Sequence, residues 1–194
     1  MSKTVSNKEN ILKEAALLFS QKGYERTSMR EIAKRVGVTK PAIYYHFSNK
    51  QELFEELVTT SFERSQKKIA EIAKSDSDPV EKLKQLALDI MEGVKQNPDG
   101  ARFMHDLMAG NIRKNIKLDH RKVFSRQEKY FTQILKEGKE RGLIKKDLNN
   151  FTFIMMFIGT INMYTIGYLK GGLPDIGRDN VDSIIDTLIN GIKN

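Results

Sequence analysis

The chain has 194 residues and carries 33 Lys and Arg against 25 Asp and Glu, a formal net charge of +8 at pH 7. It contains no cysteine, which excludes disulfides, thiolate metal sites and cysteine nucleophiles. A chain of this length forms one large or two small domains. Met1–Asn10 is polar and has no apolar core of a secretory signal, so we expect a cytoplasmic protein.

The positive charge is concentrated near the N-terminus. Residues 1–50 contain ten Lys and Arg and four Asp and Glu, whereas the other 144 residues contain 23 and 21. The net charge is therefore +6 in the first quarter and +2 in the rest. Such an uneven distribution indicates that the first 50 residues form a surface for phosphate groups.

The N-terminal region predicts three helices, of which the second and third form a helix-turn-helix. The first ends at Gly23 and the second begins at Ser28, where Glu31 stands three residues on, as in a capping box. Gly37 suits the left-handed residue after the second helix, and Thr39 suits the N-cap of the third. The connection is too short for anything but two crossing helices.

The third helix carries a group of polar side chains near one end. Its apolar residues are Ala42, Ile43 and Phe47. The remaining side chains can meet phosphates, sugars or thymine methyl groups, and they are Thr39, Lys40, Tyr44, Tyr45, His46 and Lys50. The alternative is a small surface helix with ordinary tyrosines.

Thr27–Lys50, followed by Gln-Glu-Leu-Phe, resembles the DNA-binding signature of the TetR family of repressors. The resemblance extends from Ile11 to about Leu57, and the Tyr-Tyr-His-Phe-x-x-Lys pattern of Tyr44–Lys50 is its most specific part. One departure is Pro41, where many members carry glycine, because proline removes a backbone N–H that could reach a phosphate.

The resemblance implies a dimeric regulator, acting as a repressor, that binds a palindromic DNA operator and releases it when a small apolar ligand binds the C-terminal domain. It also implies the DNA contacts, of which Arg30 and Lys40 are the expected base readers and most others contact phosphates. The predicted contact residues are Ser28, Arg30, Thr39, Lys40, Tyr44, Tyr45, His46 and Lys50.

A long helix is expected next, from a capping box at Ser48 and Gln51 to about Lys74. Ser75–Pro79 is a linker that ends in a first-turn proline. These signals divide the chain into a helix-turn-helix domain at 1–50, a connecting helix at 51–74 and an effector-binding and dimerisation domain at 75–194.

The C-terminal domain shows helical periodicity throughout and no alternating strand pattern. We expect helices at about 80–96, 103–112, 119–141, 148–169 and 179–193, with Asn97–Gly100 as a turn. The predicted fold is all-α with about nine helices.

Leu148–Leu169 contains no charged residue, which is compatible with a membrane span or with a helix that a second subunit covers. The asparagines, threonines and glycines within it favour the second interpretation, and the resemblance implies a dimer through the last two helices. The predicted interface residues are Met156, Gly159, Gly167, Ile184, Ile185 and Leu188.

The ligand site is predicted from soft or bulky side chains that adapt to apolar guests. Asn162 is added because an amide in a buried helix needs a partner. The alternative for each residue is ordinary core packing. The candidates are Phe103, Met104, Met108, Phe131, Phe151, Met155, Asn162 and Met163.

The chain lacks the motifs of common enzyme and cofactor sites, namely a glycine-rich phosphate loop, G-x-S-x-G and H-E-x-x-H. Its three histidines are too scattered for a metal site. We therefore expect no catalysis, cofactor or metal. The remaining rival function is a DNA-binding or architectural protein that needs no ligand.

Overall fold

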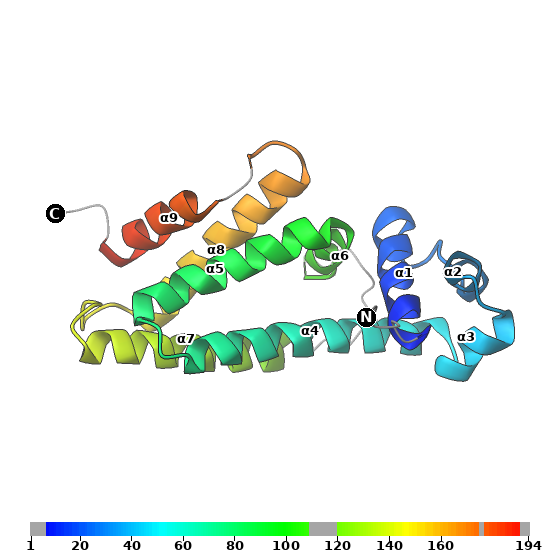
Figure 1. Ribbon diagram of the computed structural model, residues 1–194, viewed down its shortest axis with the longest axis horizontal. Coiled ribbons are helices and arrows are strands. Elements are labelled where there is room, and N and C mark those ends of the chain that lie inside the picture. The colour runs from blue at the N-terminus through cyan, green and yellow to red at the C-terminus, as the bar shows by residue number, and fades with distance from the viewer. Residues whose placement is uncertain (1–6, 109–119, 175–176, 191–194) are drawn as a thin grey trace, which may run out of the picture. The chain divides into compact units, whose positions relative to one another are not determined.

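In a computed structural model that describes residues 7–108, 120–174 and 177–190, the chain is all α-helical, as predicted. Figure 1 shows the helices of these ranges, which are α1 (Asn7–Lys22), α2 (Met29–Val36), α3 (Lys40–His46), α4 (Lys50–Lys74), α5 (Pro79–Gln96), α6 (Pro98–Met108), α7 (His120–Glu140), α8 (Asn150–Leu169) and α9 (Arg178–Asn190). The helix ends predicted near residues 112, 119 and 193 lie outside the described residues.

The helices group into two compact units. Unit 1 comprises residues 1–63 and 97–118, and unit 2 comprises residues 64–96 and 119–194. The continuous helix α4 contributes its first part to unit 1 and its second part to unit 2. α6 belongs by its contacts to the N-terminal unit, although the sequence suggested that everything after residue 75 forms a separate domain.

Capping residues fix where α2 begins and ends and where α3 begins. The Ser28 hydroxyl accepts a hydrogen bond from the N–H of Glu31 at 3.2 Å and begins α2. Gly37 ends α2 with φ of 78°, a left-handed conformation that glycine adopts without the steric cost of a Cβ. The Thr39 hydroxyl accepts from the N–H of Ala42 at 3.3 Å and begins α3. The predicted capping signals and the helix-turn-helix are thus confirmed.

An aromatic cluster fills the interior of unit 1. It consists of Phe19 of α1, Tyr24 of the α1–α2 loop, Phe54 of α4 and Phe103 of α6, each at most 6% exposed. The ring centroids of the contacting pairs lie 4.9–6.0 Å apart. Buried aromatic rings dominate the energy of such interiors. Phe103, which we predicted to line a ligand site, therefore packs α6 into the core of the N-terminal unit.

The start of α4 lies one residue later than predicted. The side-chain oxygen of Asn49 accepts from the N–H of Glu52 at 2.9 Å. The Glu52 carboxylate in turn accepts from the N–H of Ser48 at 2.8 Å. The capping pair is therefore Asn49 and Glu52 in place of Ser48 and Gln51.

α6 begins inside the segment that we predicted as a turn. Pro98 is the first residue of the helix, a position where its missing N–H costs no hydrogen bond. The side-chain oxygen of Asn97 accepts from the N–H of Gly100 at 3.1 Å. An Asn-Pro pair is compatible with a turn and with the start of a helix, and here it begins α6.

Helix α5 is the centre of unit 2 and packs against α7, α8 and α9. Lys82 of α5 is 3% exposed, and its ammonium lies 2.8 Å from the carboxylate of Glu137 on α7. This hydrogen bond holds the pKa of Glu137 below its ordinary value. Lys84 binds Asp182 at 3.3 Å and Asp186 at 3.1 Å on α9. Ion pairs therefore join α5 to two of its neighbours.

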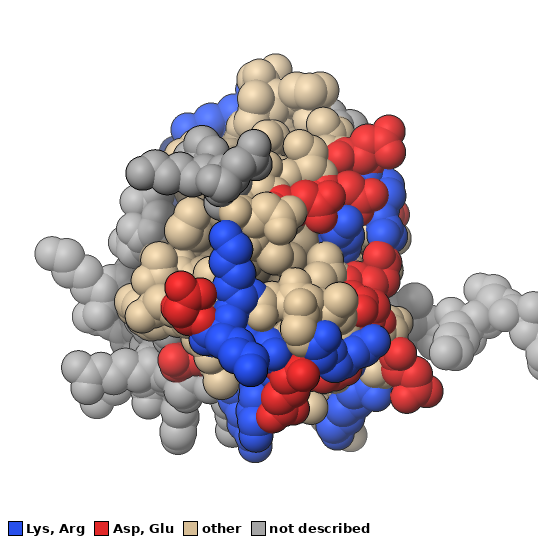
Figure 2. Space-filling model, turned by 90° about the vertical axis from the view of Figure 1, so that its left-hand side faces the viewer, with Lys and Arg blue, Asp and Glu red and all other residues tan. Residues whose placement is uncertain are grey.

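The surface of unit 2 mixes charges of both signs. Figure 2 shows the molecule from the side on which α9 and the α7–α8 connection lie in Figure 1, with acidic and basic side chains interspersed. This mixture agrees with the small net charge of the chain beyond residue 50. Opposite charges at close range leave little net field over this face.

Helix α8 is apolar on both sides but buried on only one. It has the length and hydropathy of a membrane span, yet only 28% of that apolar window is buried. Phe153, Phe157 and Ile161 are at most 2% exposed and belong to the core of unit 2. The opposite side of the helix exposes apolar side chains that no described residue covers.

The packing of Phe103 generates a stability prediction. Phe103→Ala removes a ring that is 1% exposed and contacts Phe19 and Phe54, so it should lower the free energy of unfolding by about 3–5 kcal/mol. Urea denaturation followed by circular dichroism measures this. Arg102→Ala, on the same helix but half exposed, should change stability by less than about 1 kcal/mol. Equal stability of the two variants would contradict the assignment of α6 to the core.

Candidate nucleic-acid interface

The predicted contact residues gather on the helix-turn-helix of unit 1. They come from the start of α2, from the α2–α3 turn, from α3 and, for Lys50, from the first residue of α4; two of them, Ser28 and Thr39, are the N-caps of α2 and α3. Six of the eight are exposed, namely Ser28, Arg30, Thr39, Lys40, Tyr44 and Tyr45. His46 and Lys50 are half-buried.

One side of α3 packs into the core of unit 1, and the other side exposes its two tyrosines. Ile43 is fully buried and Phe47 is 2% exposed, and both belong to the core of unit 1. Tyr45 on the other side is 87% exposed, and Tyr44 is 42% exposed. Large aromatic side chains are seldom left this open in a folded protein without a partner. The helix is therefore a rigid carrier for exposed rings.

Cationic and aromatic groups alternate on this face. The ammonium of Lys40 lies 5.9 Å from the centre of the Tyr44 ring. The rings of Tyr45 and His46 meet edge to face, with centroids 5.3 Å apart. An ammonium beside phenol hydroxyls offers donors to phosphate oxygens, while the rings can lie against thymine methyl groups or sugars.

Lys50 lies differently from the other predicted contacts. Its ammonium donates hydrogen bonds to the carbonyl oxygens of Tyr24 at 2.8 Å, Thr27 at 2.9 Å and Glu25 at 3.3 Å. It also lies 4.2 Å from the centre of the Tyr24 ring. An ammonium has three donors, and all three are directed to the α1–α2 loop. Lys50 thus holds the loop that leads into α2, and its contact with DNA stays a prediction.

Some of the basic side chains of unit 1 form ion pairs within the chain. Three basic residues are paired with carboxylates, namely Lys8 with Glu56, Lys22 with Glu31, and Arg35 with Glu14. The hydrogen bond from Lys22 holds the pKa of Glu31 below its ordinary value. Arg30 and Lys40, by contrast, have no carboxylate partner among the described residues. Lys13 and Lys34 also lack such a partner there, but of the predicted contact residues only Arg30 and Lys40 are exposed cations.

The eight candidate ligand residues are divided between the two units. Phe103, Met104 and Met108 belong to unit 1 and Phe131 to the core of unit 2, where its ring contacts Phe157 at 5.0 Å. The other four are exposed on α8, namely Phe151, Met155, Asn162 and Met163. Asn162 is exposed, so its amide needs no buried partner, contrary to the reason for which we chose it.

The candidate dimer residues lie in different environments, from exposed to fully buried. Met156 is 50% exposed, and a Cβ added at the exposed Gly159 would meet no atom within 4 Å. Ile185 is fully buried in the core of unit 2, which removes it from any interface. A Cβ at Gly167 would strike the side chain of Leu173, so this glycine is needed for packing within the chain. Ile184 and Leu188 are half-buried against the same core.

No group of three or more His, Asp and Glu side chains within the described ranges could hold a metal ion. The constellation that remains is an exposed, cationic and aromatic helix-turn-helix face on a rigid core. This arrangement defines a DNA-binding protein of the helix-turn-helix class.

Comparison with known sequences identifies the family. The sequence profile described as "Bacterial regulatory proteins, tetR family" matches residues 11–57. "Probable HTH-type transcriptional regulator YttP" of Bacillus subtilis (strain 168) is 33% identical over 151 residues, which cover 76% of this chain and 72% of that protein. The chain belongs to the TetR family of DNA-binding transcriptional regulators, whose members are not enzymes.

Two relatives extend over nearly the whole chain. "HTH-type transcriptional repressor KstR2" of Mycobacterium tuberculosis is 23% identical over 190 residues, which cover 96% of this chain and 93% of that protein. The structure of the transcriptional regulator FadR from Bacillus subtilis in complex with stearoyl-CoA has 22% identity and a TM-score of 0.77, with coverage of 95% and 98% of the two chains. The fold of all described helices is therefore that of the family.

Lys50 and Lys40 should respond differently to substitution. Lys40→Met removes a solvent-facing charge, so it should weaken DNA binding and lower the slope of log K against log salt by about one. Lys50→Met removes an internal tie, so it should lower the melting temperature and weaken DNA binding without changing that slope. Fluorescence anisotropy with a DNA duplex at several salt concentrations gives both slopes.

The wild-type chain and Lys34→Met, a change at an exposed lysine of α2, provide the reference slopes. A slope lowered by about one in Lys50→Met, with an unchanged melting temperature, would mean that Lys50 reaches a phosphate directly.

Proposed function

We propose that the protein is a homodimeric, cytoplasmic transcriptional repressor that binds a palindromic operator and leaves it when a small ligand binds unit 2. Each subunit places α3 in a major groove, and the two grooves are about one helical turn or a multiple of it apart. Ser28, Thr39, Tyr44, Tyr45 and His46 fix the register on the backbone. Arg30 and Lys40 read base edges, as the family resemblance implies, and neither has a carboxylate partner among the described residues.

The observation that carries DNA binding is the exposure of the α3 side chains on a fixed support. Tyr45 is 87% exposed while Ile43, two residues away, is fully buried. A rigid helix presenting unpartnered donors loses little conformational freedom on docking. The positive balance of residues 1–50 adds long-range attraction to a polyanion.

The exposed side of α8 supports the dimer. Met156, Gly159 and Met163 follow one another at spacings of three and four residues, so they lie along one stripe of the helix. Met163 is 65% exposed and Met156 is 50% exposed. Gly159 between them leaves open space into which a second helix can pack. Apolar stripes of this kind mark protein interfaces, and a two-fold axis suits a palindromic operator.

The covalent links between the units support control by a ligand. α4 begins in unit 1 and ends in unit 2, and α6 of unit 1 follows α5 of unit 2 after the single residue Asn97. A ligand that moves either helix in unit 2 thus acts on elements that pack around Phe54 and Phe103. The ligand must then bind more tightly to the DNA-free form than to the DNA-bound form. The relative FadR, whose structure holds stearoyl-CoA, supports a ligand of this kind.

The experiment that tests the proposal measures specificity first. Fluorescence anisotropy at about 150 mM salt compares the DNA flanking the protein's own gene with a scrambled duplex of equal length. A preference of about a thousandfold or more places the protein among specific regulators. Equal, weak binding to both duplexes contradicts regulation of the neighbouring genes.

The ligand is tested on the same complex. Acyl-CoA thioesters of increasing chain length, up to stearoyl-CoA, are added at saturating concentration, followed by a wider set of apolar compounds. Loss of anisotropy with one chemical class supports ligand-controlled release. Retention of DNA with every compound supports the alternative of a DNA-binding protein without an effector.

The dimer prediction concerns Met156. Met156→Asp places a charge on the exposed stripe of α8, where burial against a second subunit would cost several kcal/mol without a partner. The variant should be monomeric by light scattering coupled to gel filtration, and its operator affinity should fall by at least tenfold. Leu143→Asp is the matched control, because it changes a comparably exposed apolar residue of the α7–α8 connection. A dimeric Met156→Asp variant would refute an interface on this stripe.

A further inference from the structure

Of the ion pairs that join α1 to α2 and α4, the pair of Arg35 with Glu14 has the least exposed carboxylate. The Arg35 Nε of α2 lies 2.6 Å from a carboxylate oxygen of Glu14 on α1. The Glu14 side chain is 21% exposed, against 31% for Glu31 and 42% for Glu56 in the other two pairs. Water and salt screen a less exposed pair less, so Glu14 holds its cation more firmly than a surface carboxylate does.

Arg35 stands on a different side of α2 from the predicted DNA contact Arg30. Five residues turn an α-helix through about 140° beyond a full turn, so the two guanidinium groups leave α2 in different directions. The contact with Glu14 shows that Arg35 is directed toward α1. Arg35 is nevertheless in the last turn of α2, and the predicted contacts Thr39 and Lys40 follow within five residues. Glu14 thus holds a long basic side chain away from residues that we expect to meet DNA.

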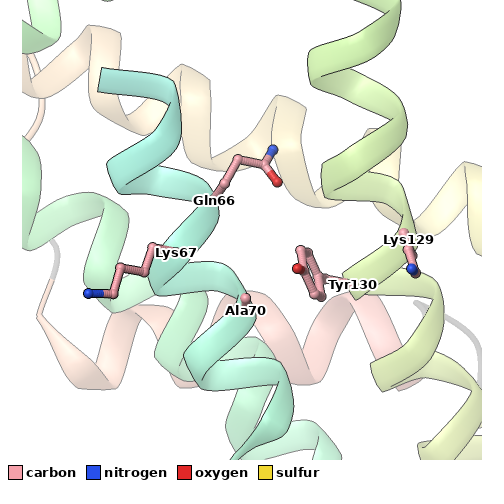
Figure 3. Close-up of a pocket in the computed structure, with 5 residues that line it drawn as sticks. All are labelled: Gln66, Lys67, Ala70, Lys129 and Tyr130. Carbon is pink, nitrogen blue, oxygen red and sulfur yellow. The ribbon is translucent and has the colours of Figure 1, made fainter. Parts of the chain in front are cut away.

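Exposed lysines of unit 2 show that a basic side chain is stable without such a partner. Lys67 of α4 and Lys129 of α7 stand beside a hollow between these helices, and Figure 3 shows both side chains turned away from it. Lys129 is exposed and pairs with no carboxylate in the part of the chain that the structure describes. Water solvates such ammonium groups strongly. An exposed cation such as Arg35 therefore needs no carboxylate for its own solvation.

An unpaired cation beside a DNA-binding face adds affinity for every sequence. Each phosphate that is neutralised releases counterions, and phosphates are the same in any duplex. The operator competes with a large excess of other sites, so affinity of this kind favours the wrong sites as well. A complex with other DNA also samples many orientations, in which a free arginine finds a phosphate, whereas an operator complex is held in one register. A carboxylate that occupies the arginine removes this contribution.

We infer that Glu14 is a specificity-determining residue, which holds Arg35 away from phosphate and so weakens binding to DNA other than the operator. The weakening follows from the DNA binding of the family, and the gain in discrimination rests on the proposed function. Glu31 holds Lys22 in a similar pair. The Glu31 carboxylate also accepts a hydrogen bond from the N–H of Ser28 at the start of α2, so Glu14 offers the cleaner test.

Glu14→Gln tests the inference on the full chain with a scrambled duplex. Fluorescence anisotropy should show binding about threefold to tenfold tighter than for the wild type, and a slope of log K against log salt steeper by about one, because one further phosphate is neutralised. A Glu14 that only supported the position of α2 would give the opposite change, since its loss would weaken binding to every duplex. Glu14→Met serves if the glutamine variant does not fold, as judged by circular dichroism. Unchanged or weaker binding by a folded variant overturns the inference.

The double variant Glu14→Gln/Arg35→Gln identifies the cation that is set free. It removes both charges of the pair, so affinity for the scrambled duplex and the salt slope should return to the wild-type values. If the double variant binds as tightly as Glu14→Gln, the carboxylate acts by repelling DNA itself, and the assignment to Arg35 is overturned.

Glu55→Gln is the matched control for the loss of one negative charge from unit 1. The Glu55 carboxylate accepts from the side-chain amide of Gln51 at 3.0 Å and has no basic partner among the described side chains. The change therefore frees no cation, and the salt slope should equal that of the wild type. Equal effects of Glu55→Gln and Glu14→Gln would show a general effect of net charge and overturn the inference.

A duplex enriched by the wild type from a random-sequence pool separates this inference from the proposed function. Glu14→Gln should gain less affinity on this duplex than on the scrambled one, so the ratio of the two affinities should fall by about threefold or more. Equal gains on both overturn the role of Glu14 in discrimination. If the wild type enriches no duplex, the proposed function fails, while tighter binding of Glu14→Gln to the scrambled duplex still supports the hold on Arg35. If the wild type prefers one duplex and Glu14→Gln gains nothing on the other, the inference fails and the proposed function stands.

Discussion

The interior of unit 1 depends on the contact between Tyr24 and its neighbours. The Tyr24 ring meets Phe54 at 4.9 Å and Phe19 at 5.3 Å, and the ammonium of Lys50 lies over it while binding the carbonyl oxygens around it. This arrangement joins α1, the loop before α2 and the start of α4. Phe103 adds α6 to the same cluster. The orientation of α2 and α3 is thus fixed by packing in the interior of unit 1 and by hydrogen bonds to the loop before α2.

The same constraint divides the positive charges of unit 1 by role. Lys50 stabilises the loop, and the lysines and arginine paired with Glu56, Glu31 and Glu14 join helices. Arg30 and Lys40 of the predicted contact set have no carboxylate partner among the described residues. A count of charges along the sequence cannot make this distinction, because it depends on which carboxylate or carbonyl lies within reach after folding. The net charge predicts the partner, and the internal pairs determine which residues meet it.

Local signals carried most of the fold prediction. The caps at Ser28 and Thr39 and the left-handed Gly37 follow from interactions over three or four residues, so the sequence alone suffices for them. Packing between residues that are far apart in the sequence was harder to predict. Phe103 has the same helical periodicity whether it lines a ligand site or joins the core of unit 1, and Ile185 looks alike at an interface and in a core.

We propose that two copies of α3, each fixed by the aromatic cluster, enter successive major grooves. Hydroxyl-radical footprinting on a duplex enriched from a random-sequence pool tests this arrangement. We expect two protected patches on one face of the duplex, with centres separated by one helical turn or a multiple of it, about 10 base pairs or a multiple. A single patch, or protection that is uniform along the duplex, would contradict it.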